Sequence, residues 1–254
     1  MSKLFSLEGR VALVTGASRG LGWAIAETFA EHGAEVVLAS RDQSALDRCA
    51  GSLAARGHKA HAMAFDVADR AAGTEAVHAV AAEHGRLDIL VNNAGIVHRD
   101  PISELADADW DRVIETNLTA AFRLAREAAK PMVAQGRGRI INIASIMATV
   151  ARPAVASYVA AKGGLAAFTR ALAVEFGPEG VNSNAIAPGY IVSDLTAALQ
   201  NDPEFDSFVR GRTPLGRWGE AREIGAVALF LASDASSYVN GHLLVADGGM
   251  TIGL

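Results

Sequence analysis

Short apolar runs alternate with longer amphipathic, alanine-rich stretches along the whole chain. Several of the apolar runs have almost no polar positions, which is typical of strands covered by helices on both faces. The runs that predict strands are Val11–Thr15, Glu35–Ser40, Ala60–Asp66, Asp88–Asn93, Arg139–Ser145, Val181–Pro188 and His242–Asp247. Their continuous hydrophobicity predicts a buried, parallel sheet rather than one with a solvated face.

The amphipathic stretches between these runs predict helices, and several of them end at a glycine such as Gly33, Gly57 or Gly177. The predicted helices are Gly20–His32, Ser44–Arg56, Arg70–His84, Asp109–Gln135, Tyr158–Phe176 and Ala221–Leu231. Repeated alternation of strand and helix predicts parallel strands joined by right-handed crossovers. We therefore expect a single α/β domain over residues 1–254, with a doubly wound parallel sheet of about seven strands and helices on both faces.

Residues 190–220 break this rhythm between the last two predicted strands, and the stretch contains Pro203 and Pro214. Long excursions of this kind are often lids or binding loops. We expect a substrate loop here; a surface excursion with no role in binding is the alternative.

Composition excludes several function classes. The net charge of −5 lacks the basic footprint of a nucleic-acid-binding protein. Lys and Arg form no run longer than a pair, which argues against a membrane-surface patch, and no apolar run reaches the roughly 18 residues of a membrane span. The N-terminal residues lack the apolar segment of a signal peptide, so a cytoplasmic protein is expected. Cys49, the single cysteine, is expected to be an ordinary small apolar helix residue.

A glycine-rich turn follows the first predicted strand in the sequence TGASRGLG, which contains Gly16, Gly20 and Gly22. Glycines there let the backbone turn sharply and approach a ligand, while the helix that follows presents free N–H groups to a pyrophosphate. A glycine pattern alone is weak, but a strand before it and a helix after it are the context of a Rossmann-type dinucleotide site. An ordinary tight turn is the alternative.

The end of the second predicted strand bears on which dinucleotide is bound. An NAD site usually has an acidic residue there for the ribose 2′-hydroxyl, whereas this chain has Ser40 followed by Arg41. A guanidinium pairs well with a 2′-phosphate, and Arg19 in the glycine turn would approach the same phosphate. We therefore expect NADP(H), with two solvated arginines as the alternative. NAD(H) stays open because a one-residue shift would present Asp42 instead.

Two further strand ends carry candidate cofactor contacts. Asp66 could accept a hydrogen bond from the adenine amino group. The sequence NNAG, Asn92–Gly95, could lie under the cofactor, although Asn92 is at least as well suited to bracing the sheet.

Tyr158 and Lys162 lie four residues apart, so on a helix they share one face. A nearby ammonium favours the phenolate and lowers the pKa of a tyrosine toward the range of an acid–base catalyst. A pair that extends to solvent is the alternative. Ser145 ends a predicted strand at the edge where open α/β sheets hold ligands. Asn117 interrupts a predicted helix as a poor helix former, which makes it a candidate to hold a water.

These motifs, together with YVAAK and APGY, occur in the order and spacing of the short-chain dehydrogenase/reductase family, which the chain resembles from about Leu7 to its C-terminal VADGG. The resemblance implies that Tyr158 is the catalytic acid–base and that Lys162 binds the nicotinamide ribose. It further implies that Ser145 orients the substrate and that Asn117 holds a relay water. It also implies a homotetramer and no metal ligands.

The cofactor contacts that the glycine turn, the strand ends and this resemblance together indicate are Gly16, Ser18, Arg19, Gly20, Leu21, Gly22, Ser40, Arg41, Asp66, Val67, Asn93, Ala94, Gly95, Tyr158, Lys162, Pro188, Gly189, Ile191 and Ser193. Ser193 stands where members of the family commonly have threonine, and it keeps the hydroxyl.

The stretches ARPAVASYVAAKG and RTPLGRWGE resemble the branch of the family that interconverts gluconate and 5-ketogluconate. For such an acid, Arg99 and Arg152 are the candidate carboxylate ligands, next to Ser145 and Tyr158 in the substrate site. Rim arginines facing solvent are the alternative. A 3-oxoacyl-acyl-carrier-protein reductase is the second candidate function, and a non-catalytic NADP(H)-binding regulator is the third.

Overall fold

The computed structural model describes residues 3–193 and 196–253. In this part of the chain seven strands form one parallel sheet in the order β3-β2-β1-β4-β5-β6-β7. The strands are β1 Val11–Thr15, β2 Glu35–Ser40, β3 Ala60–Ala64, β4 Ile89–Asn92, β5 Gly138–Ile143, β6 Val181–Pro188 and β7 Leu243–Ala246. The order turns back at β1, as the predicted doubly wound topology requires.

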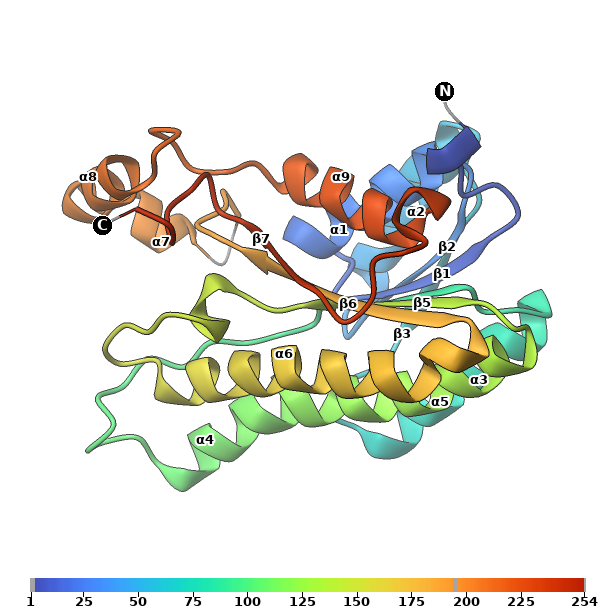
Figure 1. The fold of residues 1–254 in the computed structure, drawn as a ribbon, viewed down its shortest axis with the longest axis horizontal. Helices are drawn as coiled ribbons and strands as arrows, with labels where there is room; N and C mark the ends of the chain where they lie inside the picture. The colour runs from blue at the N-terminus through green and yellow to red at the C-terminus, as the bar shows by residue number, and fades with distance from the viewer. Residues whose placement is uncertain (1–2, 194–195, 254) are drawn as a thin grey trace.

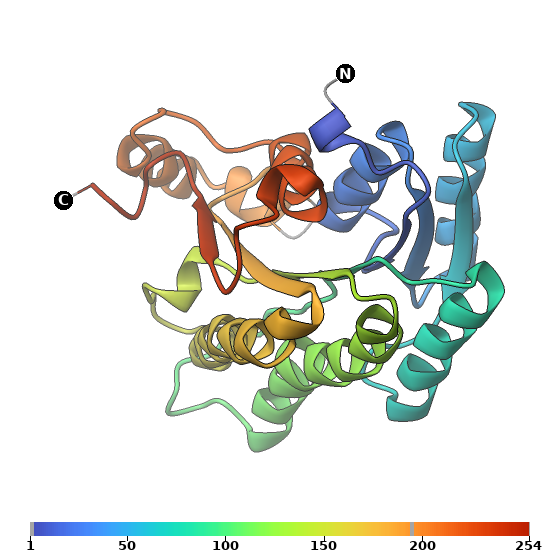
Figure 2. The same cartoon turned by 45° about the vertical axis from the view of Figure 1, so that its right-hand side comes forward.

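Helices cover both faces of this sheet (Figures 1 and 2). The α-helices are α1 Gly20–Glu31, α2 Gln43–Ala55, α3 Arg70–His84, α4 Asp107–Ile114, α5 Ala120–Ala134, α6 Ala156–Phe176, α7 Ala197–Gln200, α8 Pro203–Arg212 and α9 Ala221–Ala232. Short 3-10 turns are η1 Lys3–Phe5, η3 Ile146–Ala148, η4 Gly177–Glu179 and η5 Asp234–Ser236, and η2 Glu115–Thr119 is a π-helical turn. In Figure 1, α1, α2 and α9 lie above the sheet, and α3 to α6 lie below it.

The core has one layer on each side of the sheet. Ile25 and Phe29 of α1 pack with Leu231 of α9 on one face. Val77 of α3 and Met132 of α5 belong to the layer on the other face. Every residue of β1 and β5 is buried, as expected of strands that helices cover on both faces.

A third, smaller cluster lies under the 190–220 stretch. Its buried members are Ile146, Val209, Trp218 and Met250. The stretch therefore has a small core of its own, and Ile191 near its start belongs to the layer that contains Ile25 and Phe29. Residues 194 and 195 of this stretch lie outside the described residues.

Side-chain hydrogen bonds accompany the two largest differences between predicted and observed strand ends, those of the third and fifth strands. The third strand was expected to reach Asp66, but it ends at Ala64, and the Asp66 carboxylate accepts a hydrogen bond from the Ala68 N–H at 2.9 Å. The fifth was expected to reach Ser145, but it ends at Ile143, and the Ser145 hydroxyl accepts one from the Met147 N–H at 3.1 Å. Both polar residues turn the chain out of the sheet.

The predicted helix Asp109–Gln135 is wrong as a single element. The observed segment begins at Asp107 as α4, becomes π-helical over η2 and continues as α5. Such single π-turns arise where one extra residue is accommodated within a helix, and they often occur at functional sites. Within the described residues, no helix is both long and apolar enough to cross a membrane.

Candidate active site

The carboxyl ends of the parallel strands meet at one edge of the sheet, where open α/β sheets hold their ligands. The loop after β1 carries the glycine turn, and the loop after β4 carries Asn93–Gly95. Ser145 follows β5, and Gly189 to Ser193 follow β6. In Figure 1 this edge faces the same side of the molecule as α7 and α8.

The glycine turn is locked to the loop after β4. Gly16 has φ +65°, and a Cβ placed on Gly22 would lie 2.2 Å from the Gly16 carbonyl oxygen and 2.5 Å from Asn93 Nδ2. The Asn93 amide donates to the carbonyl oxygens of Thr15 at 2.8 Å and Gly16 at 3.2 Å. The predicted cofactor residue Asn93 thus shapes the turn itself, and only glycine fits at positions 16 and 22.

The N-terminus of α1 is suited to a pyrophosphate. Arg19 occupies the N-cap position without a side-chain cap, and the first turn contains no acidic residue. The amide groups of that turn are therefore accessible to an anion, and the helix dipole favours one. A Cβ on Gly20 would come within 3.9 Å of Ser193, so the turn and the segment after β6 approach each other as a nucleotide cradle requires.

Asp42, the alternative cofactor residue after β2, is the N-cap of α2. Its carboxylate caps α2 by accepting from the Ala45 N–H at 3.0 Å, and its own N–H donates to the Ser40 hydroxyl at 3.3 Å. Ser40 is the last residue of β2, so it occupies the position where an NAD site has an acid. Arg41 is exposed and its Nη1 lies 4.0 Å from Asp66 Oδ2, which brings two predicted nucleotide residues together.

Tyr158 and Lys162 lie one turn apart on α6, next to Ser145. The Lys162 side chain is buried; its Nζ donates to the Ile143 carbonyl at 2.6 Å and lies 5.5 Å from the centre of the Tyr158 ring. A hydrogen bond from Ser145 reaches Tyr158. The three side chains predicted to perform the chemistry are therefore in one cluster at the carboxyl edge.

Electrostatics in this cluster differ from the expectation that Lys162 lowers the pKa of Tyr158. Burial raises the pKa of Tyr158, and the Ser145 hydrogen bond and the charge of Arg99 oppose that rise. Burial lowers the pKa of Lys162 to about 8. The difference has a geometric reason, because the ammonium is held by a backbone carbonyl and lies over the ring rather than at the hydroxyl.

Asn117 lies in the π-turn, where it is buried. Its amide Nδ2 donates to the Ile96 carbonyl at 2.8 Å, and its Oδ1 accepts from the Ile96 N–H at 2.8 Å. A Cβ on Gly95 would lie 3.2 Å from Asn117 Oδ1 and 3.7 Å from Lys162 Nζ. The side chain thus fixes the loop after β4 beside the lysine, and the water-holding role of Asn117 stays a prediction.

Asn92 takes the bracing role that was one of its two predicted functions. Its Nδ2 donates to Asn142 Oδ1 at 2.9 Å, and Asn142 Nδ2 donates to Thr169 Oγ1 at 2.9 Å. This buried chain joins β4, β5 and α6, so it ties the helix of Tyr158 to the sheet. Sequence reasoning missed Asn142 and Thr169, although a polar residue inside an apolar strand was a signal.

The two candidate carboxylate ligands are placed differently. Arg99 is exposed, yet its charge reaches Tyr158. The Arg152 guanidinium lies 5.1 Å from the centre of the Phe205 ring, and its Nη1 is 3.4 Å from the Tyr190 hydroxyl. The Tyr190 ring in turn contacts Phe205 and Trp218, with centroids 5.3 and 5.6 Å away. Sequence reasoning missed these aromatic residues, which stand out in a chain that is only 6% aromatic.

The remaining predicted cofactor residues lie on the loops of the same edge. Pro188 ends β6, the Gly189 N–H donates to the Ala246 carbonyl at 3.0 Å, and Ile191 bridges to Gly219. Ser18 is in the glycine turn, and Leu21 packs against the core layer that contains Ile25 and Phe29. Val67 and Ala94 line a small cavity beside Asn117.

The comparisons with known proteins agree with this geometry. The family described as enoyl-(acyl carrier protein) reductase matches residues 16–251. Gluconate 5-dehydrogenase of Gluconobacter oxydans is 44% identical over 99% of this chain and 98% of its own length. The 3-oxoacyl-[acyl-carrier-protein] reductase FabG of Salmonella typhimurium is 40% identical over 96% of this chain and 98% of its own.

A solved structure extends the likeness to three dimensions. The gluconate 5-dehydrogenase from Burkholderia cenocepacia, in complex with NADP and tartrate, superposes with a TM-score of 0.96 at 39% identity, covering 99% of both chains. Sequence motifs, sheet topology and whole-length similarity agree, and the chain belongs to the short-chain dehydrogenase/reductase family.

Proposed function

We propose that this chain is an NADP(H)-dependent oxidoreductase that interconverts a secondary alcohol and a ketone on a sugar acid of the gluconate/5-ketogluconate type. The observation that carries the proposal is the cluster of Tyr158, Ser145 and Lys162 at the carboxyl edge, next to the glycine turn. The relative from Gluconobacter oxydans and the NADP- and tartrate-bound structure support the substrate class, because tartrate is also a hydroxy acid.

The residues present fit the cofactor. The free amides of α1 suit a pyrophosphate, Ser40 with Arg41 suits a 2′-phosphate, and the buried Lys162 suits the ribose next to the nicotinamide. NADP(H) supplies or accepts the hydride when bound. The chain's own contribution is to hold the substrate oxygen and to move its proton.

Tyr158 and Ser145 hold the substrate oxygen and move its proton. Burial raises the pKa of Tyr158, so its hydroxyl is protonated at neutral pH and can donate the proton that the ketone oxygen needs on reduction. In the reverse direction the same oxygen takes the proton from the alcohol. The Ser145 hydroxyl holds the substrate oxygen, and the charge of Arg99 stabilises the phenolate after transfer.

Residues 190–220 are proposed to form the substrate loop of a single domain spanning 1–254. Support comes from Arg152, which contacts Tyr190 and Phe205 of this stretch. A guanidinium held by an aromatic ring and a phenol is positioned for a carboxylate.

Replacing Arg152 by alanine is expected to raise the KM for 5-ketogluconate by about 10- to 100-fold, because a charge-assisted hydrogen bond contributes roughly 1.5–3 kcal/mol. The kcat should change little, since Tyr158 and Ser145 are untouched. Steady-state kinetics would measure this, with Arg56→Ala as the control, an arginine at the end of α2 that pairs with Glu27 of α1. An unchanged KM would remove Arg152 from the substrate site.

Cofactor choice provides a second test. The double variant Ser40→Asp with Arg41→Ala is expected to lower kcat/KM for NADPH by at least about 100-fold, because a carboxylate replaces a phosphate partner. Efficiency with NADH should rise, since aspartate can accept from a ribose hydroxyl. The exposed Arg48 provides the control Arg48→Ala. Equal loss with both cofactors would place the 2′-phosphate elsewhere.

Reduction of 3-oxoacyl thioesters is the second candidate function, and the 40% identity to FabG favours it. Purified protein should be assayed with NADPH against 5-ketogluconate and an acetoacetyl thioester. We expect turnover of 5-ketogluconate. Turnover of the thioester alone would reject the sugar-acid function. NADPH binding without turnover of either would support a regulator.

We also propose that the enzyme is a cytoplasmic homotetramer. Apolar side chains are exposed on the helices below the sheet, among them Phe122 of α5 (42%) and Val174 of α6 (80%), as expected of faces that pair with other subunits. Light scattering on the eluting protein would measure the subunit number.

A further inference from the structure

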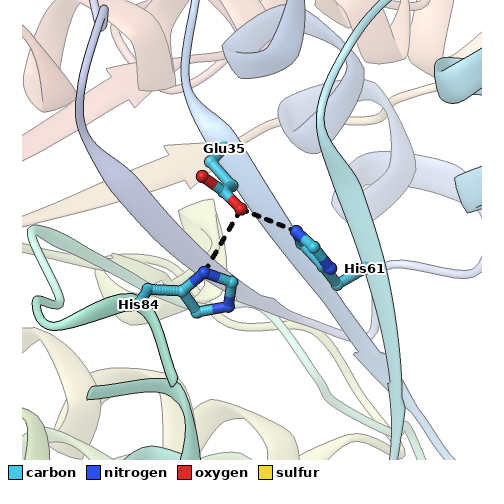
Figure 3. A group of neighbouring side chains, drawn as sticks. All are labelled: Glu35, His61 and His84. Atoms are coloured by element: carbon cyan, nitrogen blue, oxygen red, sulfur yellow. Dashed lines mark hydrogen bonds and ion pairs between the residues drawn. The ribbon is translucent and has the colours of Figure 1, made fainter. Parts of the chain in front are cut away.

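Three metal-ligating side chains converge at the edge of the sheet opposite to Tyr158. Glu35 is the first residue of β2, His61 lies near the start of β3, and His84 ends α3. Figure 3 shows the carboxylate between the two imidazoles. Glu35 Oε1 lies 2.7 Å from His61 Nε2 and 3.2 Å from His84 Nδ1.

The cluster is sheltered yet reachable from solvent. The side chain of His84 is 8% exposed, that of Glu35 is 24% exposed, and that of His61 is 43% exposed. The two imidazole rings meet edge to face with centroids 4.9 Å apart. All three ligand atoms lie within 4.8 Å of one another, so a single ion could contact each of them after small side-chain movements.

We propose that Glu35, His61 and His84 form a binding site for a divalent transition-metal ion of the zinc type. Two imidazole nitrogens and one carboxylate oxygen are a ligand set that such ions prefer, and water completes the tetrahedron. Metal–ligand bonds of about 2.0–2.2 Å place neighbouring ligand atoms about 3.3 Å apart. The Glu35–His84 distance already matches this value, and the Glu35–His61 pair has to open slightly.

The protonation states suit a cation. Burial opposes ionisation of Glu35, but the His61 hydrogen bond and the electrostatic influence of His84 and Lys59 hold the pKa of Glu35 below its usual value. The ligand is therefore a carboxylate at neutral pH. Each imidazole that now faces Glu35 with an N–H can bind a metal through that nitrogen once its proton moves to the other ring nitrogen.

Lys59 is the one nearby group of the described residues that competes with a metal. Its Nζ lies 3.6 Å from Glu35 Oε2, and its side chain is 77% exposed, so it can move into solvent. A second cluster, His98 with Asp100 and Asp109, is less suited, because Arg112 already bonds Asp109 at 2.8 Å. Removal of the Lys59 charge should therefore tighten metal binding at Glu35, and changes in the second cluster should leave it unaffected.

The site would act on stability and not on turnover. It joins β2, β3 and α3 at the amino edge, and β2 extends roughly 17 Å from Glu35 to the nucleotide end at Ser40. An ion that binds only the folded chain raises its apparent stability. The sequence predicted no metal ligands, because these three residues are far apart in the chain and share no local spacing.

Metal-free full-length protein should be titrated with Zn²⁺ by calorimetry, and Tm measured with Zn²⁺ and with a chelator. We expect one equivalent to bind and Tm to rise by several degrees at a hundredfold excess over Kd. His61→Gln and His84→Gln should each weaken binding at least about tenfold. Lys59→Gln should tighten it a few-fold, and His58→Gln, which alters a neighbouring histidine outside the cluster, should leave it unchanged.

Circular dichroism and NADPH binding would show that the variants remain folded. Co²⁺ gives an independent readout on the wild-type protein, because a low-symmetry nitrogen and oxygen site should produce visible absorption that excess Zn²⁺ abolishes. Equal Zn²⁺ affinity in wild type and in the His61→Gln/His84→Gln double variant would overturn the proposal. Loss of binding in Asp109→Asn instead would assign the metal to the second cluster.

Discussion

Tyr158→Phe is expected to lower kcat for ketone reduction by about 10²–10⁴-fold, the contribution typical of a positioned general acid. The ring and its packing against Lys162 remain, and only the hydroxyl that Ser145 contacts is lost. NADPH binding and Tm should therefore stay close to wild type. Single-turnover measurement of NADPH oxidation with 5-ketogluconate would separate the chemical step from binding and release.

Tyr238→Phe is the matched control because Tyr238 is fully exposed. It should leave kcat and KM unchanged. A Tyr158→Phe enzyme with wild-type turnover would remove the phenol from the mechanism, and the proton would then have to come from another group.

Lys162→Met is expected to abolish most activity while stabilising the cofactor-free protein. Burial lowers the pKa of Lys162 from 10.5 to about 8, which corresponds to roughly 3 kcal/mol of destabilisation by the charged form. The variant also loses the hydrogen bond to the Ile143 carbonyl, which reduces its gain in stability by about 1 kcal/mol. At pH 7 the variant should therefore be more stable by about 1–3 kcal/mol in urea denaturation.

The pH dependence of this difference has a definite sign. The folded pKa of Lys162 lies below the unfolded value, so the unfolded chain binds the proton more tightly and wild-type stability rises with pH between about 8 and 10.5. The advantage of Lys162→Met should be full below pH 8 and shrink above it. Lys3→Met, at an exposed lysine, is the control. A variant less stable than wild type at pH 7 would contradict a costly buried ammonium.

The strands could be predicted well because their signal is local. β1, β2 and β6 begin and end where the apolar runs do, since these strands are buried along nearly their whole length. The largest errors at strand ends occurred where one polar side chain bonds the backbone just after the strand, as Asp66 and Ser145 do. Helical periodicity could not show the π-turn around Asn117, and it could not show the bond from Asn117 to Ile96, which lies in a different segment.

In the candidate site, too, features within one segment could be predicted, and features that depend on distant segments could not. The positions of Gly16, Tyr158 and Lys162 followed from spacing within one element. The direction of the pKa shift of Tyr158 did not, because it depends on which atom Lys162 bonds and on how far the phenol is removed from solvent. The contact between Arg152 and Phe205 was also beyond reach, since it requires the path of the 190–220 stretch.

That stretch rests on a small core of its own, in which Val209 and Trp218 pack with Ile146 and Met250. Substitutions of these four residues are expected to change the small core without disturbing the layers that hold the sheet, because none of the four belongs to either layer. As the proposed substrate loop, the stretch is a candidate for exchange between related enzymes in one piece. A transplant of the stretch should carry Ile146 and Met250 with it, because these two of the four residues lie outside 190–220.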